Sequence, residues 1–210
     1  VIVAAYVIIE NNTIKNSFFA IHVANATNVI IPNNNIKSKS ESEQYSGNGI
    51  HLWKCNNMLV ADNHIEGHRD GIYFEFVTNS YIQNNHSEKN IRYGLHFMFS
   101  HENAYLQNTF VNNGAGVAVM YSKKVLMHGN AFNQNWGTAA YGLLLKDITD
   151  SQIIGNHFTQ NTMGILMEGT ARIDVYRNNF RNNGWAMKVQ ANCSENSFHH
   201  NNFIANTFDI

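Results

Sequence analysis

Histidine and methionine recur in this 210-residue sequence at spacings that could bring them together on one surface. His96 and Met98 stand two residues apart, so in a β-strand both side chains project from the same face. Met120 follows Met98 by 22 residues, and His51 stands at the matching place of an earlier segment. Imidazole and thioether ligands together suit Cu(I). We therefore take His51, His96, Met98 and Met120 as candidate ligands for transiently bound copper(I), although no compact ligand motif such as CxxC accompanies them.

Large aromatic side chains accompany these candidate ligands. We expect the accompanying residues to contact a partner: Trp53, Tyr73, Glu75, Phe99 and Tyr121. Outward aromatic and Met side chains are costly to hydrate, and they are typical of protein interfaces. The alternative is that ordinary β-propensity placed aromatics there, helped by stacking between neighbouring strands.

A repeat of about 22 residues must position these side chains. One column is an Asn placed two residues before a mostly apolar position, with spacings of 22, 29, 22, 23, 22, 26, 22 and 23 residues. Its members are Asn12, Asn34, Asn63, Asn85, Asn108, Asn130, Asn156, Asn178 and Asn201. A second column is a small residue that opens a strand-like run, at Gly49, Gly71, Gly94, Gly116, Gly142, Gly164 and Ala186. The spacing lengthens at the same place in both columns, so we expect insertions to lie between coils and the coils themselves to be intact.

The repeat predicts an all-β protein, a right-handed parallel β-helix of about nine coils. After each Gly, the first and third positions are apolar while the second and fourth vary, as in a strand with one buried face. Asn tolerates left-handed backbone at the corners, and stacked Asn side chains can form amide ladders. A leucine-rich repeat has a similar period but usually returns through a helix, whereas this chain shows strand alternation and Gly there. Right-handedness follows from the crossover rule for parallel strands.

Residues 1–210 read as a single domain and as a fragment of a longer chain, because neither end shows the polar cap that a solenoid needs. The net charge of −1 argues against nucleic-acid and anionic-membrane binding, which need clustered positive charge. No apolar run approaches the roughly 20 residues of a membrane span. Cys55 and Cys193 lie six coils apart, too far for a disulfide.

The rival class is a carbohydrate-acting β-helix enzyme: a polysaccharide lyase, a hydrolase or a uronate epimerase. Such sites need clustered carboxylates or a cation that several carboxylates hold. The outward carboxylates Glu75, Asp147 and Glu168 are scattered over several coils, so we assign no catalytic residue. The remaining candidates read as turn or solvated loop residues, namely Arg69, Asp70, His64, His68, His199 and His200.

Five strings resemble one family closely. They are RDGIYFEF (69–76), RYGLHFMFSH (92–101), GAGVAVMYS (114–122), YGLLLK (141–146) and NTFD (206–209). Over roughly residues 45–210 the chain is similar to NosD, a periplasmic accessory protein for maturation of the copper enzyme nitrous oxide reductase.

The resemblance implies an exported, periplasmic and non-catalytic protein. Its partners would be the membrane and ATPase subunits of an ABC transporter, a copper chaperone and apo nitrous oxide reductase. It assigns no ligand residue. Because the most family-like strings contain His96, Met98, Met120 and Tyr121, we expect that face to dock a copper-carrying partner.

Overall fold

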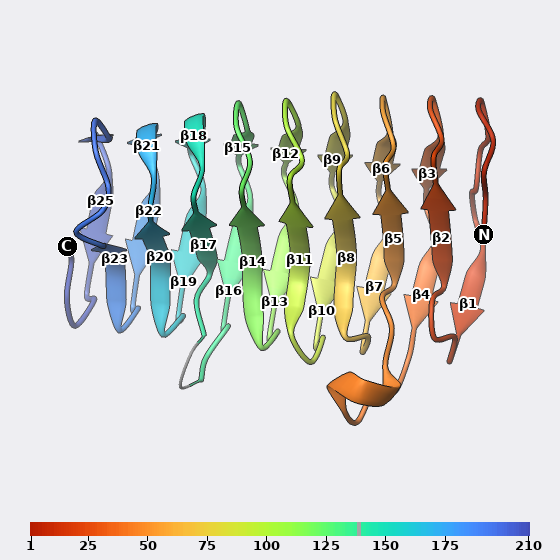
Figure 1. Cartoon of the computed structure of the whole chain (residues 1–210). Coiled ribbons are helices and arrows are strands. Elements are labelled where there is room, and N and C mark those ends of the chain that lie inside the picture. Colours follow the sequence, from red (N-terminus) through yellow and green to blue (C-terminus); the bar gives the residue numbers. More distant parts are fainter. Residues whose placement is uncertain (138–139) are drawn as a thin grey trace.

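The computed structural model describes residues 1–137 and 140–210, and over them the chain winds as a parallel β-helix, which confirms the predicted fold class (Figure 1). Successive strands pass through three parallel sheets in turn, so each coil adds one strand to each sheet. We name the sheets the front, lower and upper walls by their places in Figure 1. The nine strands of the lower wall, counted over the described residues, match the predicted number of coils.

The front wall contains β2 (Ile21–Ala24), β5 (Ile50–Trp53), β8 (Asp70–Glu75), β11 (Tyr93–Met98), β14 (Ala115–Met120), β17 (Leu143–Lys146), β20 (Met163–Glu168) and β23 (Trp185–Val189). The lower wall contains β1 (Thr13–Lys15), β4 (Asn35–Lys37), β7 (His64–Glu66), β10 (His86–Glu88), β13 (Thr109–Val111), β16 (Ala131–Asn133), β19 (His157–Thr159), β22 (Asn179–Arg181) and β25 (Asn202–Ile204). The upper wall contains β3 (Ile30–Pro32), β6 (Leu59–Ala61), β9 (Tyr81–Gln83), β12 (Ala104–Leu106), β15 (Leu126–His128), β18 (Thr149–Ile154), β21 (Ala171–Tyr176) and β24 (Ser197–His199).

The core lies between the walls and follows from the period-two pattern of each strand. In β8, Ile72 and Phe74 point inward and are fully buried, while Tyr73 and Glu75 between and after them are partly exposed. Phe110, Phe132, Phe158 and Phe180 of the lower wall stack on one another inside the helix, with adjacent ring centroids 4.6–5.5 Å apart. One contiguous apolar column therefore runs along the axis of the solenoid.

The predicted Asn ladder is present at the corner between the upper and lower walls. The Asn108 Oδ1 atom accepts hydrogen bonds from the backbone N–H and the side-chain Nδ2 of Asn85, each 3.0 Å long. The Nδ2 of Asn108 donates to the carbonyl of Ile82 at 2.9 Å. The ladder thus satisfies buried backbone groups that the turn leaves unpaired.

A second amide ladder lies at the corner between the lower and front walls, and the sequence columns did not predict it. It consists of Asn90, Asn113, Asn135, Asn161, Asn183 and Asn206. Each Asn after the first accepts a hydrogen bond from the backbone N–H of the one before it, and Asn90 accepts one from the backbone N–H of His68. Together the ladders fix the coil-to-coil register at two of the three corners.

Both predicted insertions leave the coil at the same corner, between the lower and front walls. The first joins β4 to β5 and contains the 3₁₀ helix η1 (Glu43–Tyr45), and the second joins β16 to β17. The helix η1 of the first insertion projects below the front wall in Figure 1.

The two cysteines are free thiols, as their predicted separation requires, with Cys55 buried and Cys193 partly exposed. Among the described residues, no helix is long and apolar enough to cross a membrane.

Candidate functional site

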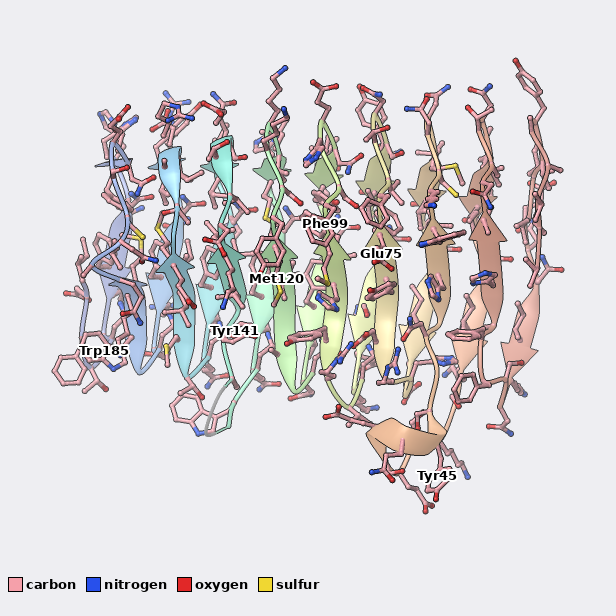
Figure 2. The ribbon with its side chains drawn as sticks, viewed as in Figure 1. Tyr45, Glu75, Phe99, Met120, Tyr141 and Trp185 are labelled. Carbon is pink, nitrogen blue, oxygen red and sulfur yellow. The ribbon has the colours of Figure 1, made fainter. Side chains whose placement is uncertain are left out.

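The register of the front wall sets the predicted site residues in two parallel rows. In the first row, His51 lies opposite Tyr73, which lies opposite His96 on the next strand. In the second row, neighbours on successive strands are Trp53, Glu75, Met98 and Met120. Figure 2 shows Glu75, Phe99 and Met120 on the near face of this wall. The structure therefore brings the predicted residues onto one surface, and their roles stay a prediction.

The first row is a recessed column of rings. His22, His51, Tyr73 and His96 pack edge to face, with successive centroids 4.6, 4.9 and 5.1 Å apart. His51 and His96 are separated by the strand that carries Tyr73, a gap of about 9.6 Å from two strand spacings. Because bonds from a metal to imidazole are roughly 2 Å long, these two histidines do not share one ion.

His96 faces outward from the sheet, as predicted, but neighbouring rings cover it. Its side chain is on the outer face of the sheet but is only 6% exposed, because the rings of Tyr73 and Tyr93 pack against it. Neither ring nitrogen has a hydrogen-bond partner among the described residues. The Nδ1 atom lies 3.9 Å from a carboxylate oxygen of Asp70.

Asp70 is a buried carboxylate, so the interpretation of Asp70 as a turn residue was wrong. It opens strand β8, is fully buried, and receives two hydrogen bonds from Arg92, Nε to Oδ1 at 3.0 Å and Nη2 to Oδ2 at 2.6 Å. Burial alone would raise the pKa of Asp70, but neighbouring His96 and Arg92 outweigh it and hold that pKa below its usual value. Arg69, also expected in a turn, lies just before the strand with its Nε 3.9 Å from the Asp70 carboxylate.

A ladder of exposed aromatic rings runs along the edge where the front wall turns into the upper wall. Phe76 stacks on Phe99 at 5.3 Å, and Phe99 stacks on Tyr121 at 5.0 Å, with ring planes 12–13° apart. The three side chains are 43%, 37% and 39% exposed. Phe99 and Tyr121 were predicted partner residues, whereas Phe76 was missed. The signal for Phe76 was its place five residues after Gly71, which matches Phe99 after Gly94 and Tyr121 after Gly116.

Backbone geometry does not explain this aromatic ladder. Phe76, Phe99 and Tyr121 all have a left-handed backbone, with φ of 56°, 49° and 52°. Asn and Gly adopt that conformation most readily, and in other coils the equivalent corner is occupied by Asn25, Lys54, Asp147 and Gly169. Bulky aromatics at the same corner are therefore conformationally costly and point to a role for their side chains.

The two insertions flank a cleft below this face. It has a volume of about 590 Å³ and is lined by residues that include Glu43, Arg92, Tyr93, Trp136 and Tyr141. The hydroxyls of Tyr93 and Tyr141 lie 3.4 Å apart, and burial raises the pKa of Tyr141. Figure 2 places Tyr141 on the lower half of the front wall and Tyr45 at the lower edge of the molecule. The cleft therefore adjoins Arg92, the partner of Asp70.

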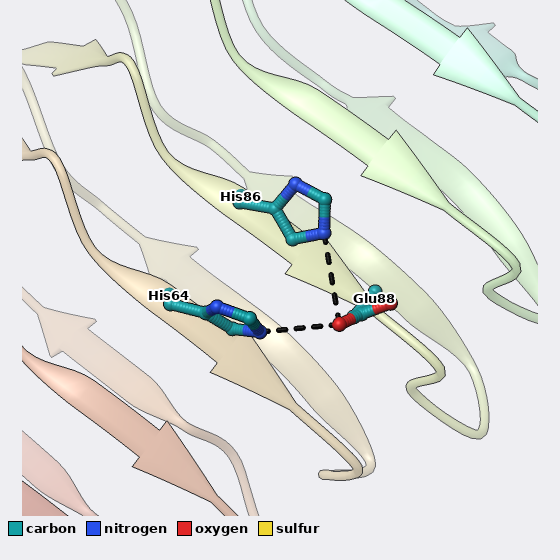
Figure 3. Close-up of side chains that lie close together, drawn as sticks. All are labelled: His64, His86 and Glu88. Carbon is teal, nitrogen blue, oxygen red and sulfur yellow. Dashed lines mark hydrogen bonds and ion pairs between the residues drawn. The ribbon is translucent and has the colours of Figure 1, made fainter.

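Of the four histidines interpreted as solvated loop residues, two are exposed and two do not fit the interpretation. His199 and His200 are exposed, although His199 belongs to strand β24. His64 instead belongs to strand β7 of the lower wall, and His68 is 1% exposed, so the interpretation was wrong for these two. The polar residues around His64 resemble a turn in the sequence, because the strand that contains it is only three residues long. His64 forms a cluster with His86 and Glu88, which Figure 3 shows.

Solved structures share this fold at low sequence identity. AlgG, a periplasmic alginate epimerase, superimposes with a TM-score of 0.80 at 15% identity, over 91% of this chain and 49% of that chain. The A-module of the Azotobacter vinelandii mannuronan C-5 epimerase AlgE6 gives 0.67 at 13% identity, over 96% and 73%. The Streptococcus pneumoniae surface protein and adhesin PfbA gives 0.63 at 14% identity, over 95% and 67%. At these identities the likeness shows the fold alone.

The chain spans about half the length of the AlgG structure. It matches no curated protein. Residues 33–210 match the sequence profile of a family described as periplasmic copper-binding protein, NosD. Because that match covers most of the 210 residues, the chain belongs to the NosD family of periplasmic copper-binding proteins.

Proposed function

We propose that this chain is part of a non-catalytic periplasmic scaffold that helps copper reach apo nitrous oxide reductase. Its partners in this role are a copper chaperone and the membrane and ATPase subunits of an ABC transporter. Membership of the NosD family supports the copper-related and periplasmic parts of the proposal. The front wall supplies the surface on which the partners dock.

The exposed aromatic ladder is the observation that carries the docking role. Phe76, Phe99 and Tyr121 expose flat stacked rings, and Met98 and Met120 lie beside them on adjacent strands. Aromatic and Met side chains are enriched in protein interfaces, and a contiguous apolar patch is costly to leave in water. Because the rings are already stacked, little side-chain entropy is lost when a partner covers them.

The paired thioethers are suited to holding copper(I) briefly during transfer. Met98 lies directly opposite Met120 in the parallel register, and both side chains are partly exposed. Soft thioether ligands favour Cu(I), and a site with few ligands releases its ion more readily than a closed site. His96 on the same strand adds a buried imidazole whose nitrogens are free of hydrogen bonds among the described residues. His51 lies further along the recessed row of rings.

Copper retention is tested by anaerobic titration of Cu(I) against a chromophoric chelator. We expect the wild-type protein to compete for Cu(I) and the double variant Met98→Ala, Met120→Ala to lose that competition. Met163→Ala is the matched control, because Met163 is also partly exposed on the front wall but lies in β20. No retention by the wild-type protein would refute the copper-holding part of the proposal.

Docking is tested separately by measuring binding of the copper chaperone and of apo nitrous oxide reductase to immobilised protein. We expect the triple variant Phe76→Ser, Phe99→Ser, Tyr121→Ser to weaken binding of at least one partner tenfold or more, or roughly 1.4 kcal/mol, as for a hot spot. Tyr81→Ser removes an exposed aromatic from the upper wall and should leave binding unchanged. Equal affinity of the triple variant and the wild-type protein would rule out the ladder as the docking site.

The cluster of Asp70, Arg92 and His96 favours one second candidate, a carbohydrate-acting enzyme. The cluster adjoins the cleft that Tyr93 and Tyr141 line, and imidazole and phenol groups can act as general acid and base. The Arg92 guanidinium is engaged by Asp70, however, and His96 is buried. Turnover of oligouronates that His96→Gln abolishes would favour this candidate, whereas absence of turnover with intact Cu(I) binding would favour the scaffold.

A further inference from the structure

The geometry points to a second metal site, on the lower wall, in which His64, His86 and Glu88 bind a divalent first-row transition ion such as Cu²⁺ or Zn²⁺. The site goes beyond the proposed function, because it lies on a different wall from the aromatic ladder and its ligands are nitrogen and oxygen atoms. It does not depend on whether the front wall binds Cu(I) or a partner.

Parallel register brings the three ligands together. His64 in β7 lies directly opposite His86 in β10, and Glu88 is two residues beyond His86, so all three side chains leave the same face. The ring centroids of His64 and His86 are 5.0 Å apart. Figure 3 shows one nitrogen of each ring directed at the same carboxylate oxygen of Glu88.

The three ligand atoms lie within 4.8 Å of one another, and two of their separations are close to those around a bound ion. The Oε1 atom of Glu88 lies 3.1 Å from Nε2 of His64 and 3.7 Å from Nε2 of His86. In a tetrahedral site with metal–ligand bonds of about 2.0–2.1 Å, two ligand atoms are separated by roughly 3.3 Å. The three side chains therefore need only small adjustments to hold an ion between them.

Neighbouring charges leave Glu88 available to a cation. Glu66, the equivalent residue one coil earlier, is engaged by Lys37 at 3.1 Å and by Lys89 at 3.0 Å. One oxygen of Glu88 then lies 3.7 Å from Lys89, while the other faces the two imidazoles. The two lysines and two glutamates balance in charge, so the cluster does not repel a cation.

Exposure gives the ion an entry route and an open coordination position. The side chains of His64 and His86 are each 41% exposed, and that of Glu88 is 18% exposed. Two imidazoles with one carboxylate are a ligand set that zinc and copper(II) accept, and three protein ligands leave a position for water or for a ligand donated by a partner. The order of divalent affinities predicts tighter binding of Cu²⁺ than of Zn²⁺.

The site is tested by isothermal titration of metal-free protein with Cu²⁺ and with Zn²⁺. The binding phase assigned to this site should weaken tenfold or more in His64→Asn, His86→Asn and Glu88→Gln, since loss of even an outer-shell group costs about 10–100-fold in metal affinity. His157→Asn is the matched control, because His157 occupies the same row of the lower wall in β19 without a histidine on either neighbouring strand. Electron paramagnetic resonance of the Cu²⁺ form should show coupling to imidazole nitrogen, reduced in either His variant.

Two outcomes would overturn the site: absence of Cu²⁺ and Zn²⁺ binding by the wild-type protein, or unchanged binding in the double variant His64→Asn, His86→Asn. Circular dichroism checks that this variant still folds, which the exposure of both side chains leads us to expect. The variant Met98→Ala, Met120→Ala should keep the divalent site intact. Failure of the front-wall proposal and failure of this one are therefore distinguishable.

Discussion

The front and lower walls carry histidines in matching coils, yet the two walls treat them in opposite ways. His96 of the front wall is buried, whereas His64 and His86 of the lower wall are well exposed. Strand spacing and parallel register are common to both walls, so the backbone does not cause the difference. The neighbours do: tyrosines at positions 73 and 93 pack on His96, whereas Asn35 and Thr109 flank the lower pair.

This contrast teaches that a β-helix presents the same grid of side chains on every wall, and that the residues one coil above and below decide how each position behaves. Large neighbours turn an outward histidine into part of a packed cluster with Asp70. Short polar neighbours leave it exposed, as at the metal site that we propose. The front wall thus combines a packed cluster with the exposed aromatic ladder that we propose as a docking surface, and the lower wall carries exposed imidazole and charged side chains.

The strongest test contrasts an inner ring with an outer one. Phe132→Ala should lower the free energy of unfolding by about 4 kcal/mol, because it leaves a cavity in the stacked column of the core. Phe99→Ala removes a ring that is already partly hydrated, so we expect a loss under about 1 kcal/mol. Chemical denaturation of both variants measures the difference. Equal losses would mean that the aromatic ladder is structural and would weaken its assignment to docking.

The second test compares the two carboxylates. Asp70→Asn breaks the ion pair between the fully buried Asp70 carboxylate and the partly exposed Arg92, and should cost about 3 kcal/mol of unfolding free energy. Glu88→Gln changes a partly exposed carboxylate and should cost less than about 1 kcal/mol. Denaturant titration again gives both values. A small effect of Asp70→Asn would contradict the view that the front cluster is part of the packed structure.

The third test uses pH at the corner between the two walls. Burial lowers the pKa of His68 to about 4, from an ordinary value of 6.5. Between these two pH values the unfolded chain takes up a proton that the folded chain does not, so stability falls as pH falls from 6.5 towards 4. At pH 5, this one residue lowers the free energy of unfolding by about 2 kcal/mol relative to its value at neutral pH.

We expect His68→Leu to flatten this part of the stability profile, measured by denaturation at intervals between pH 4 and pH 7. Wild-type and variant proteins should differ most in slope between pH 6.5 and pH 4 and should run parallel above pH 7. Parallel profiles over the whole range would show that burial of His68 does not control the acid response.

Much of the front wall could be predicted, because residues that contact each other between successive coils are separated in the sequence by one period of about 22 residues. The Asn and Gly columns predict Met98 beside Met120 and Trp53 beside Glu75, and the strand register confirms both pairs. The lower cluster carried a similar signal that was missed: His64 and His86 each follow an Asn of the first column directly. Three-residue strands between turn residues concealed it, since so short an element looks like part of a loop.

The period of the sequence determined the fold, the number of coils, the insertions and the face on which each strand residue lies, because parallel strands in register convert a linear repeat into a grid. Only the tertiary structure decided that Asp70 is buried against Arg92, that tyrosine rings cover His96, and that Glu88 faces two imidazoles. Those outcomes depend on side-chain size, rotamer and charge between neighbouring coils. A period states which residues are adjacent, but packing and electrostatics decide what adjacent residues do.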